Sequence, residues 1–118
     1  MNSDELKLRT KQFALRVISL VDALPKTLTG RTLGAQLIRS GTSVAANYRA
    51  ACRARSKNEF ISKLGIVVEE ADESVFWLEM IIETKLLKQV LVESLLKEAS
   101  EITAIMVASS NSSRKNNK

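Results

Sequence analysis

The sequence predicts an all-α protein with the fold of an up-and-down antiparallel four-helix bundle. The composition combines 45% hydrophobic residues with only four Gly and one Pro, which disfavours both a turn-rich β fold and a disordered chain. Apolar residues recur at spacings of three and four along most of the chain, as they do on one face of an α-helix. A length of 118 residues suits one domain around a single core.

The first two helices are bounded by residues that cap or break helices. Ser3 is a candidate N-cap, because its side chain can accept a hydrogen bond from an exposed backbone N–H. A first helix is therefore expected at about 4–24. Pro25 ends it, because proline disfavours helical geometry in the residue before it. A second helix, rich in basic and small residues, is expected at about 31–55.

The second half of the chain predicts two more helices. Ser56 and Glu59 form a capping-box pattern, which starts a third helix at about 57–84. Apolar spacing predicts a fourth helix at about 90–108. The remaining segment, 109–118, is polar and has no apolar anchor. We expect it to be a disordered tail, because ordering it would bring no burial to offset the lost entropy.

Charged residues on the second and third helices are expected to pair. If the two helices fold back on each other about Ser56, Arg39 comes near Asp72 or Glu73. Guanidinium and carboxylate groups match in bidentate geometry. The acidic residues of the third helix also allow a carboxylate metal site, but ferritin-like sites use Glu-x-x-His, and the chain has no histidine. A structural charge pair is the preferred interpretation.

The third helix carries apolar residues on two sides. A helix of this kind must bury both sides, which one bundle of this size does not readily provide. We therefore expect a homo-oligomer. The residues expected in core or oligomer packing are Trp77, Phe76, Met80 and Gly41.

Residue types that perform chemistry are missing or isolated. Without histidine, and with Cys52 as the single cysteine, catalysis by Cys–His or Ser–His pairs and zinc binding are not expected. The glycines form neither GxGxxG nor GxxxxGK[ST], so nucleotide binding by those motifs is excluded. Cys52 lies among arginines that could activate a thiol, but a helical cysteine in an Ala-rich stretch is usually a packing residue. We expect no enzyme and no cofactor.

A basic set surrounds the break between the second and third helices. The formal net charge of +5 suits nucleic acid, an anionic membrane or an acidic protein. The basic set fits either an anion-binding surface or a solvated helix end. No signal peptide or long apolar run is present, so a cytoplasmic protein without a membrane association is expected. The candidate nucleic-acid-binding residues are Arg49, Arg53, Lys57, Arg55 and Lys63.

Several short segments resemble a known family. They are Gln36-Leu37-Ile38-Arg39-Ser40, Ser43-Val44-Ala45-Ala46-Asn47, Arg55-Ser56 with Glu59-Phe60, and Glu70-Ala71-Asp72-Glu73-Ser74 leading into Trp77-Leu78-Glu79. Together they resemble the four-helix bundle family also called the ribosomal RNA intervening-sequence proteins. Many members follow the Asn with x-x-Glu-Gly, whereas this chain has Tyr48-Arg49-Ala50-Ala51. The departure makes this part of the chain more basic.

The resemblance carries expectations about assembly and partners. It implies an up-and-down bundle that assembles into a ring-shaped homo-oligomer, by similarity a homopentamer, without an established enzymatic activity. A related branch resembles the accessory proteins of diversity-generating retroelements, which are basic pentamers that associate with nucleic acid and reverse transcriptase. We therefore expect a non-enzymatic protein that binds RNA or DNA with little sequence specificity, since aromatic residues for base stacking are few. The alternative is a protein–protein interaction scaffold or regulator with no nucleic-acid role.

Overall fold

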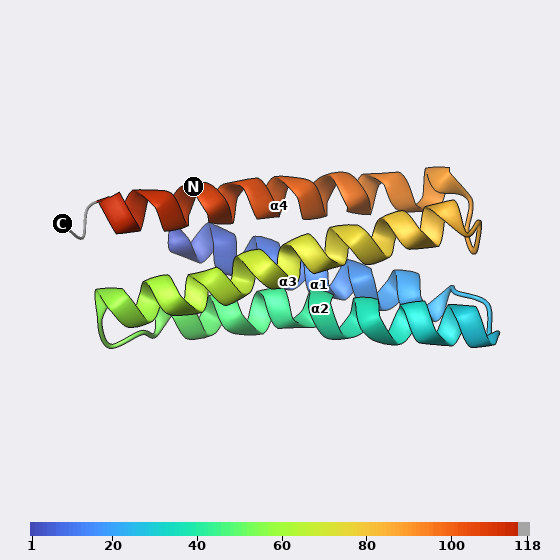
Figure 1. The fold of residues 1–118 in the computed structure, drawn as a ribbon, viewed down its shortest axis with the longest axis horizontal. Coiled ribbons are helices and arrows are strands. Elements are labelled where there is room, and N and C mark those ends of the chain that lie inside the picture. The colour runs from blue at the N-terminus through green and yellow to red at the C-terminus, as the bar shows by residue number, and fades with distance from the viewer. Residues whose placement is uncertain (116–118) are drawn as a thin grey trace.

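The computed structural model describes residues 1–115, and within that range the chain forms four α-helices and no strand (Figure 1). The helices are α1 (Ser3–Asp22), α2 (Leu28–Cys52), α3 (Lys57–Glu83) and α4 (Gln89–Lys115). They run alternately up and down. The start of α1, the α2–α3 connection and the end of α4 therefore lie toward one end of the bundle (Figure 1). The predicted all-α fold class with four helices is confirmed.

Side-chain caps explain where the first three helices begin. Asn2, rather than Ser3, caps α1, and its Oδ1 accepts from the Glu5 backbone N–H at 2.8 Å. Thr27 caps α2, which begins and ends about three residues earlier than the sequence pattern indicates. Ser56 caps α3, and its Oγ accepts from the Glu59 N–H at 3.1 Å. Each cap satisfies a backbone donor that the first helical turn leaves without a partner.

The end of α4 differs from the sequence-based prediction. The segment 109–115 is not a disordered tail but continues α4 to Lys115. Ser110 is buried there, and its Oγ accepts from Arg114 Nε at 3.4 Å. Once a helix has formed, each added residue gains a backbone hydrogen bond, so a polar segment can extend a helix that is already packed. The last residues of the predicted tail, 116–118, lie outside the described residues.

The core lies along the axis of the bundle and receives one apolar face from each helix. It also contains two hydroxyl groups, Ser40 on α2 and Ser74 on α3, whose Oγ atoms are 2.9 Å apart. Buried polar groups require such partners, so this bond favours one axial register between α2 and α3. The largest fully buried side chains include Phe13, Leu37, Leu64, Leu78, Ile81, Ile102 and Met106.

Arg39 spans the α2–α3 seam close to the buried serines. Its guanidinium donates to Glu70 Oε2 at 2.9 Å and to Glu73 Oε1. Glu70, rather than Asp72, is thus the second acidic partner, and Asp72 is exposed. The reason is helical geometry: Glu70 and Glu73 are about one turn apart on the side facing α2, whereas Asp72 is rotated by about 100° from Glu73.

The residues expected in packing have different surroundings. Gly41 is buried between α2 and α1. Trp77 and Met80 are partly buried against the core, and Trp77 Nε1 donates to Glu73 Oε1 at 3.1 Å. Phe76 is 49% exposed, with its ring edge-on to Trp77 at a centroid distance of 4.9 Å. Within a single chain, therefore, the second apolar side of α3 is only partly covered.

Candidate nucleic-acid interface

Positive charge is concentrated in one half of the bundle. Contacts of Arg9 with Glu98, of Gly41 with Val17 and of Ser40 with Ser74 align the four helices lengthwise. They place the segments 1–11, 47–66 and 96–115 in the same half. These segments contain eleven Lys and Arg against five Asp and Glu, and the remainder of the described range 1–115 contains six against eight. Antiparallel folding thus gathers most of the positive charge in one half of the bundle. We call this half the basic end.

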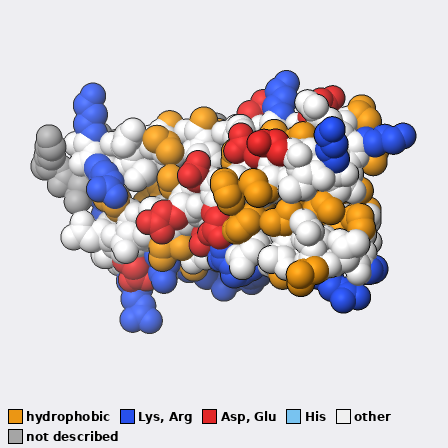
Figure 2. Space-filling view, turned by 45° about the vertical axis from the view of Figure 1, so that its right-hand side comes forward, with side chains coloured by type: hydrophobic (Ala, Val, Ile, Leu, Met, Phe, Trp, Pro, Cys, Tyr) orange, Lys and Arg blue, Asp and Glu red, His pale blue; other side chains and the backbone are white. Residues whose placement is uncertain are grey.

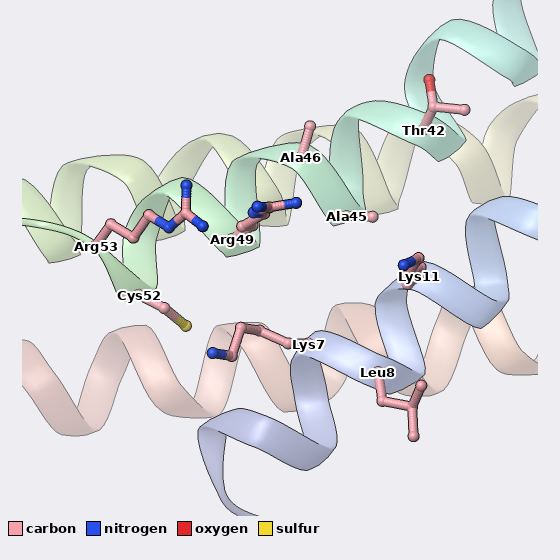
Figure 3. A pocket seen from close by; sticks show the side chains of 9 residues that line it. All are labelled: Lys7, Leu8, Lys11, Thr42, Ala45, Ala46, Arg49, Cys52 and Arg53. Atoms are coloured by element: carbon pink, nitrogen blue, oxygen red, sulfur yellow. The ribbon is translucent and has the colours of Figure 1, made fainter.

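A groove follows the seam between α1 and α2 at the basic end (Figure 3). Its volume is about 650 Å³. Lys7 and Lys11 of α1, Arg49 of α2 and Arg53, which caps the C-terminus of α2, line it. Figure 3 shows Lys7 extending from α1 toward Cys52, with Arg49 and Arg53 on the facing helix. We call this the basic groove, and no carboxylate is among its lining residues in the part of the chain that the structure describes.

The lining between the four cations is small or apolar. Leu8 of α1, with Ala45, Ala46 and Cys52 of α2, supplies most of it. The alanines belong to the run of small residues on α2. Because small side chains fill little of the space between two helices, this part of the seam is hollow while the long Lys and Arg side chains flank it.

The cations of the basic groove are largely free of acidic partners. Lys11, Arg49 and Arg53 form no ion pair with any residue in the described range 1–115. Lys7 lies 3.2 Å from Asp4, and such exposed pairs contribute little. Arg9 is different, because it turns toward α4 and binds Glu98 and Glu101. The basic groove can therefore offer its charge to an external anion.

Cys52 lies at the edge of the groove, next to Tyr48 on the preceding turn of α2. Burial, with the neighbouring Cys52 thiol, raises the pKa of Tyr48 well above its ordinary value. The phenol therefore stays neutral throughout the physiological range. Tyr48 belongs to the buried core, and Cys52 is partly buried against that core.

The predicted nucleic-acid-binding residues divide into two groups. Arg49 and Arg53 are exposed and meet in the basic groove. Arg55 in the α2–α3 connection and Lys57 at the start of α3 are exposed but do not line it, and Lys63 is partly buried on α3. The spacing of four residues between Arg49, Arg53 and Lys57 does not produce one continuous ridge, because α2 ends at Cys52 and Lys57 begins α3. The two arginines line a groove with α1 instead.

Lys7 and Lys11 were missed by reasoning from the sequence. Their spacing of four residues places them on one face of α1, and this was the available signal. A helix face alone does not show which neighbour it meets, however. Only the packing of α1 on α2 brings these lysines to Arg49 and Arg53.

Other types of site find no support in the described residues. Within 1–115, no group of three or more Cys, Asp or Glu side chains is arranged to hold a metal ion. None of the helices in that range is long and apolar enough to cross a membrane.

Comparison with known proteins identifies the family. The model of the 23S rRNA-intervening sequence protein family matches residues 5–108. The chain belongs to this family. A crystal structure from Bacteroides thetaiotaomicron, described as a protein with unknown function from the S23 ribosomal protein family, is 32% identical in sequence. The similarity covers 94% of this chain and 99% of that chain, with a TM-score of 0.87.

No curated protein sequence matches this intervening-sequence protein. The family match nevertheless includes every residue that lines the basic groove, whereas Arg114 and Lys115 lie beyond it. The predicted family resemblance is confirmed.

Proposed function

We propose that this intervening-sequence protein is a non-enzymatic helical-bundle protein that binds RNA or DNA through the basic groove with little sequence preference. The observation that carries the proposal is the meeting of four cations from two helices around one groove. Three of them lack an ion pair within residues 1–115. The family description, which refers to 23S rRNA, also supports an RNA partner.

Phosphate is the part of a nucleic acid that suits this groove. Lys and Arg side chains bind phosphate oxygens irrespective of sequence, and each contact releases counterions. Among residues 1–115, no Asn, Gln or aromatic side chain lines the groove, and these are residue types that identify or stack on bases. Affinity should therefore be strongly dependent on salt and weakly dependent on sequence.

The test is a salt titration of binding to mixed RNA and to duplex DNA. The variant Lys11→Ala, Arg49→Ala, Arg53→Ala should bind more weakly and flatten the slope of log K against log salt, by roughly two to three units if each cation contacts one phosphate. The matched control is Lys26→Ala, Arg31→Ala, Lys88→Ala, which removes three exposed cations from the opposite half of the bundle. Equal losses of affinity in the two triple variants would argue against the groove as the binding site. Wild-type protein that fails to bind at about 50 mM salt would overturn the proposal.

Assembly into a homo-oligomer, a pentamer by resemblance, is part of the proposal. Its support is the exposed apolar surface in the half opposite the basic end, where Phe76, Val90 and Leu91 are exposed. Figure 2 shows hydrophobic side chains gathered toward the end that holds the α3–α4 connection, with acidic side chains beside them. Light scattering should give a mass well above the 13.1 kDa of one chain. A monomer at micromolar concentration would contradict this.

The same apolar surface favours the second candidate function, a protein–protein interaction scaffold without a nucleic-acid role. The two functions differ in their response to salt. A complex held by apolar contacts changes little over the range in which a phosphate complex dissociates. A pull-down from native lysate, with and without nuclease, distinguishes them directly.

A further inference from the structure

The basic groove combines two kinds of surface that a phosphate alone does not require. Four cations provide charge, but the rest of the lining is mostly apolar, formed by Leu8, Ala45, Ala46 and Cys52 with Thr42 as the one uncharged polar residue among the described residues. Leu8, which lines the groove from α1, is 57% exposed. Covering such a side chain is favourable in proportion to the apolar area removed from water. The preferred ligand is therefore anionic and also has an apolar face.

The size of the groove agrees with a ligand of this kind. Its volume of about 650 Å³ lies within the usual range of roughly 300 to 1,000 Å³ for small-molecule sites. A nucleobase has a flat face of low polarity and is joined to phosphates on both sides of its sugar. A base on the apolar lining would leave its flanking phosphates near the lysines of α1 and the arginines of α2, on opposite sides of the seam (Figure 3).

From these features we infer that the basic groove receives an unpaired base, so that this protein binds single-stranded nucleic acid in preference to duplex. The inference rests on the proposed function and adds the class of substrate. In a duplex the bases are paired and stacked, and the outer surface offers mainly phosphate and sugar. A duplex therefore reaches the flanking cations but leaves Leu8 and the alanines uncovered. An unpaired base covers them without base-specific hydrogen bonds, so the preference concerns strandedness rather than sequence.

The first test uses wild-type protein and three probes with equal numbers of phosphates. These are a thymidine oligonucleotide, an abasic strand of the same length, and a duplex. Since the lining is aliphatic, the effect of the base should fall at the low end for base contacts with proteins, about fivefold tighter binding of the thymidine strand than of the abasic strand. Binding of the duplex should also be weaker than that of the thymidine strand.

The second test alters the apolar lining without changing charge. Leu8→Ser should abolish the preference for the thymidine strand over the abasic strand while leaving the salt slope unchanged. Leu15→Ser is the matched control, because Leu15 is also on α1, is 56% exposed, and lies outside the basic groove. Both side chains are largely in solvent, and circular dichroism verifies that each variant is folded.

The possible outcomes separate the inference from the proposed function. Equal binding of all three probes, or tighter binding of the duplex, overturns the inference and leaves phosphate binding in place. If the preference for the thymidine strand over the abasic strand survives Leu8→Ser but is lost in Leu15→Ser, the base binds to another surface. That result overturns the assignment to this groove. Failure of every probe to bind at low salt overturns both. A preference lost only in Leu8→Ser supports the inference.

Discussion

Gly41 of α2 packs directly against Val17 of α1. A methyl group at Gly41 would lie 2.8 Å from Val17 Cγ2 and 2.9 Å from Cγ1, much closer than the optimal separation of about 3.5 to 4.0 Å between carbon atoms. Val17 is fully buried, and its branched side chain has few alternative rotamers. This contact therefore sets how closely α1 and α2 approach at the middle of the bundle.

Replacement of Gly41 by alanine should destabilise the protein. Alanine gains about 1 kcal/mol of helix propensity over glycine, but overpacking of a core typically costs about 1 to 3 kcal/mol. We expect a net loss of about 1 kcal/mol in the free energy of unfolding, measured by urea denaturation. In a Val17→Ala background, Gly41→Ala should reduce the free energy of unfolding by less than it does alone. A double-mutant cycle detects this coupling.

Gly65→Ala is the matched control for this prediction. Gly65 also lies inside a helix, but a methyl group there would meet no described atom within 4 Å beyond its chain neighbours and the backbone of its own helix. The substitution should therefore stabilise the protein by up to about 1 kcal/mol through propensity alone. If the two alanine variants shift stability in the same direction, the close contact does not control the packing of α1 on α2.

Protonation of Glu98 should weaken the contact between α1 and α4. The pKa of Glu98 is lowered from its ordinary value, mainly because Arg9 donates a hydrogen bond to it, although partial burial opposes the shift. Below the ordinary glutamate pKa of about 4.3, the unfolded chain binds more protons here than the folded chain. The stabilisation is therefore complete above that pH and is lost as the pH falls through the lowered pKa.

The variant Glu98→Gln measures this contribution. The side chains of Arg9 and Glu98 are 22% and 18% exposed, so we expect the free energy of unfolding to fall by about 1 kcal/mol near neutral pH. The difference in free energy of unfolding between variant and wild type should shrink as the pH falls to about 3. Glu93→Gln is the control, because Glu93 is an exposed residue of α4 without an ion pair inside the described range. A difference that stays constant with pH would contradict the assignment to ionised Glu98.

The adjacent residues Phe76 and Trp77 should respond differently to truncation. Trp77 is partly buried and bonded to Glu73, so Trp77→Ala should reduce stability by about 2 kcal/mol, less than the 3 to 5 kcal/mol for a fully buried tryptophan. Phe76 is largely exposed, so Phe76→Ser should lower the mass in light scattering while the isolated bundle stays folded. Unfolding must be compared at one protein concentration, since assembly stabilises the folded state. An unchanged mass would remove Phe76 from the proposed oligomer contact.

Removal of the end of α4 should destabilise the folded protein. A chain ending at Ala108 loses the helical segment 109–115, including buried Ser110. We expect a smaller total helix signal in circular dichroism and a loss of stability of about 1 kcal/mol, within the usual range for a localised change. A chain ending at Lys115 retains all of α4 and is the control. Equal stability of the two shortened chains would show that the segment contributes nothing to the fold.

The sequence by itself determined the four helices and the class of fold. Such features are local: the Ser56 cap needs only the Glu59 N–H three residues later, and the apolar face of α3 needs only a period of 3.6 residues. The concentration of arginines near the end of α2 is also visible in the sequence. Composition was misleading for 109–115, because a polar segment gives little apolar signal even when it extends a packed helix.

The tertiary structure decided how the helices face one another. It selected Glu70 rather than Asp72 as the second partner of Arg39, and it brought Lys7 and Lys11 to the arginines of α2. These outcomes depend on the rotation and axial position of each helix, which periodicity within one helix does not specify. They are set by contacts between distant residues, such as Gly41 against Val17, because the fit of side chains at the seam determines which faces meet.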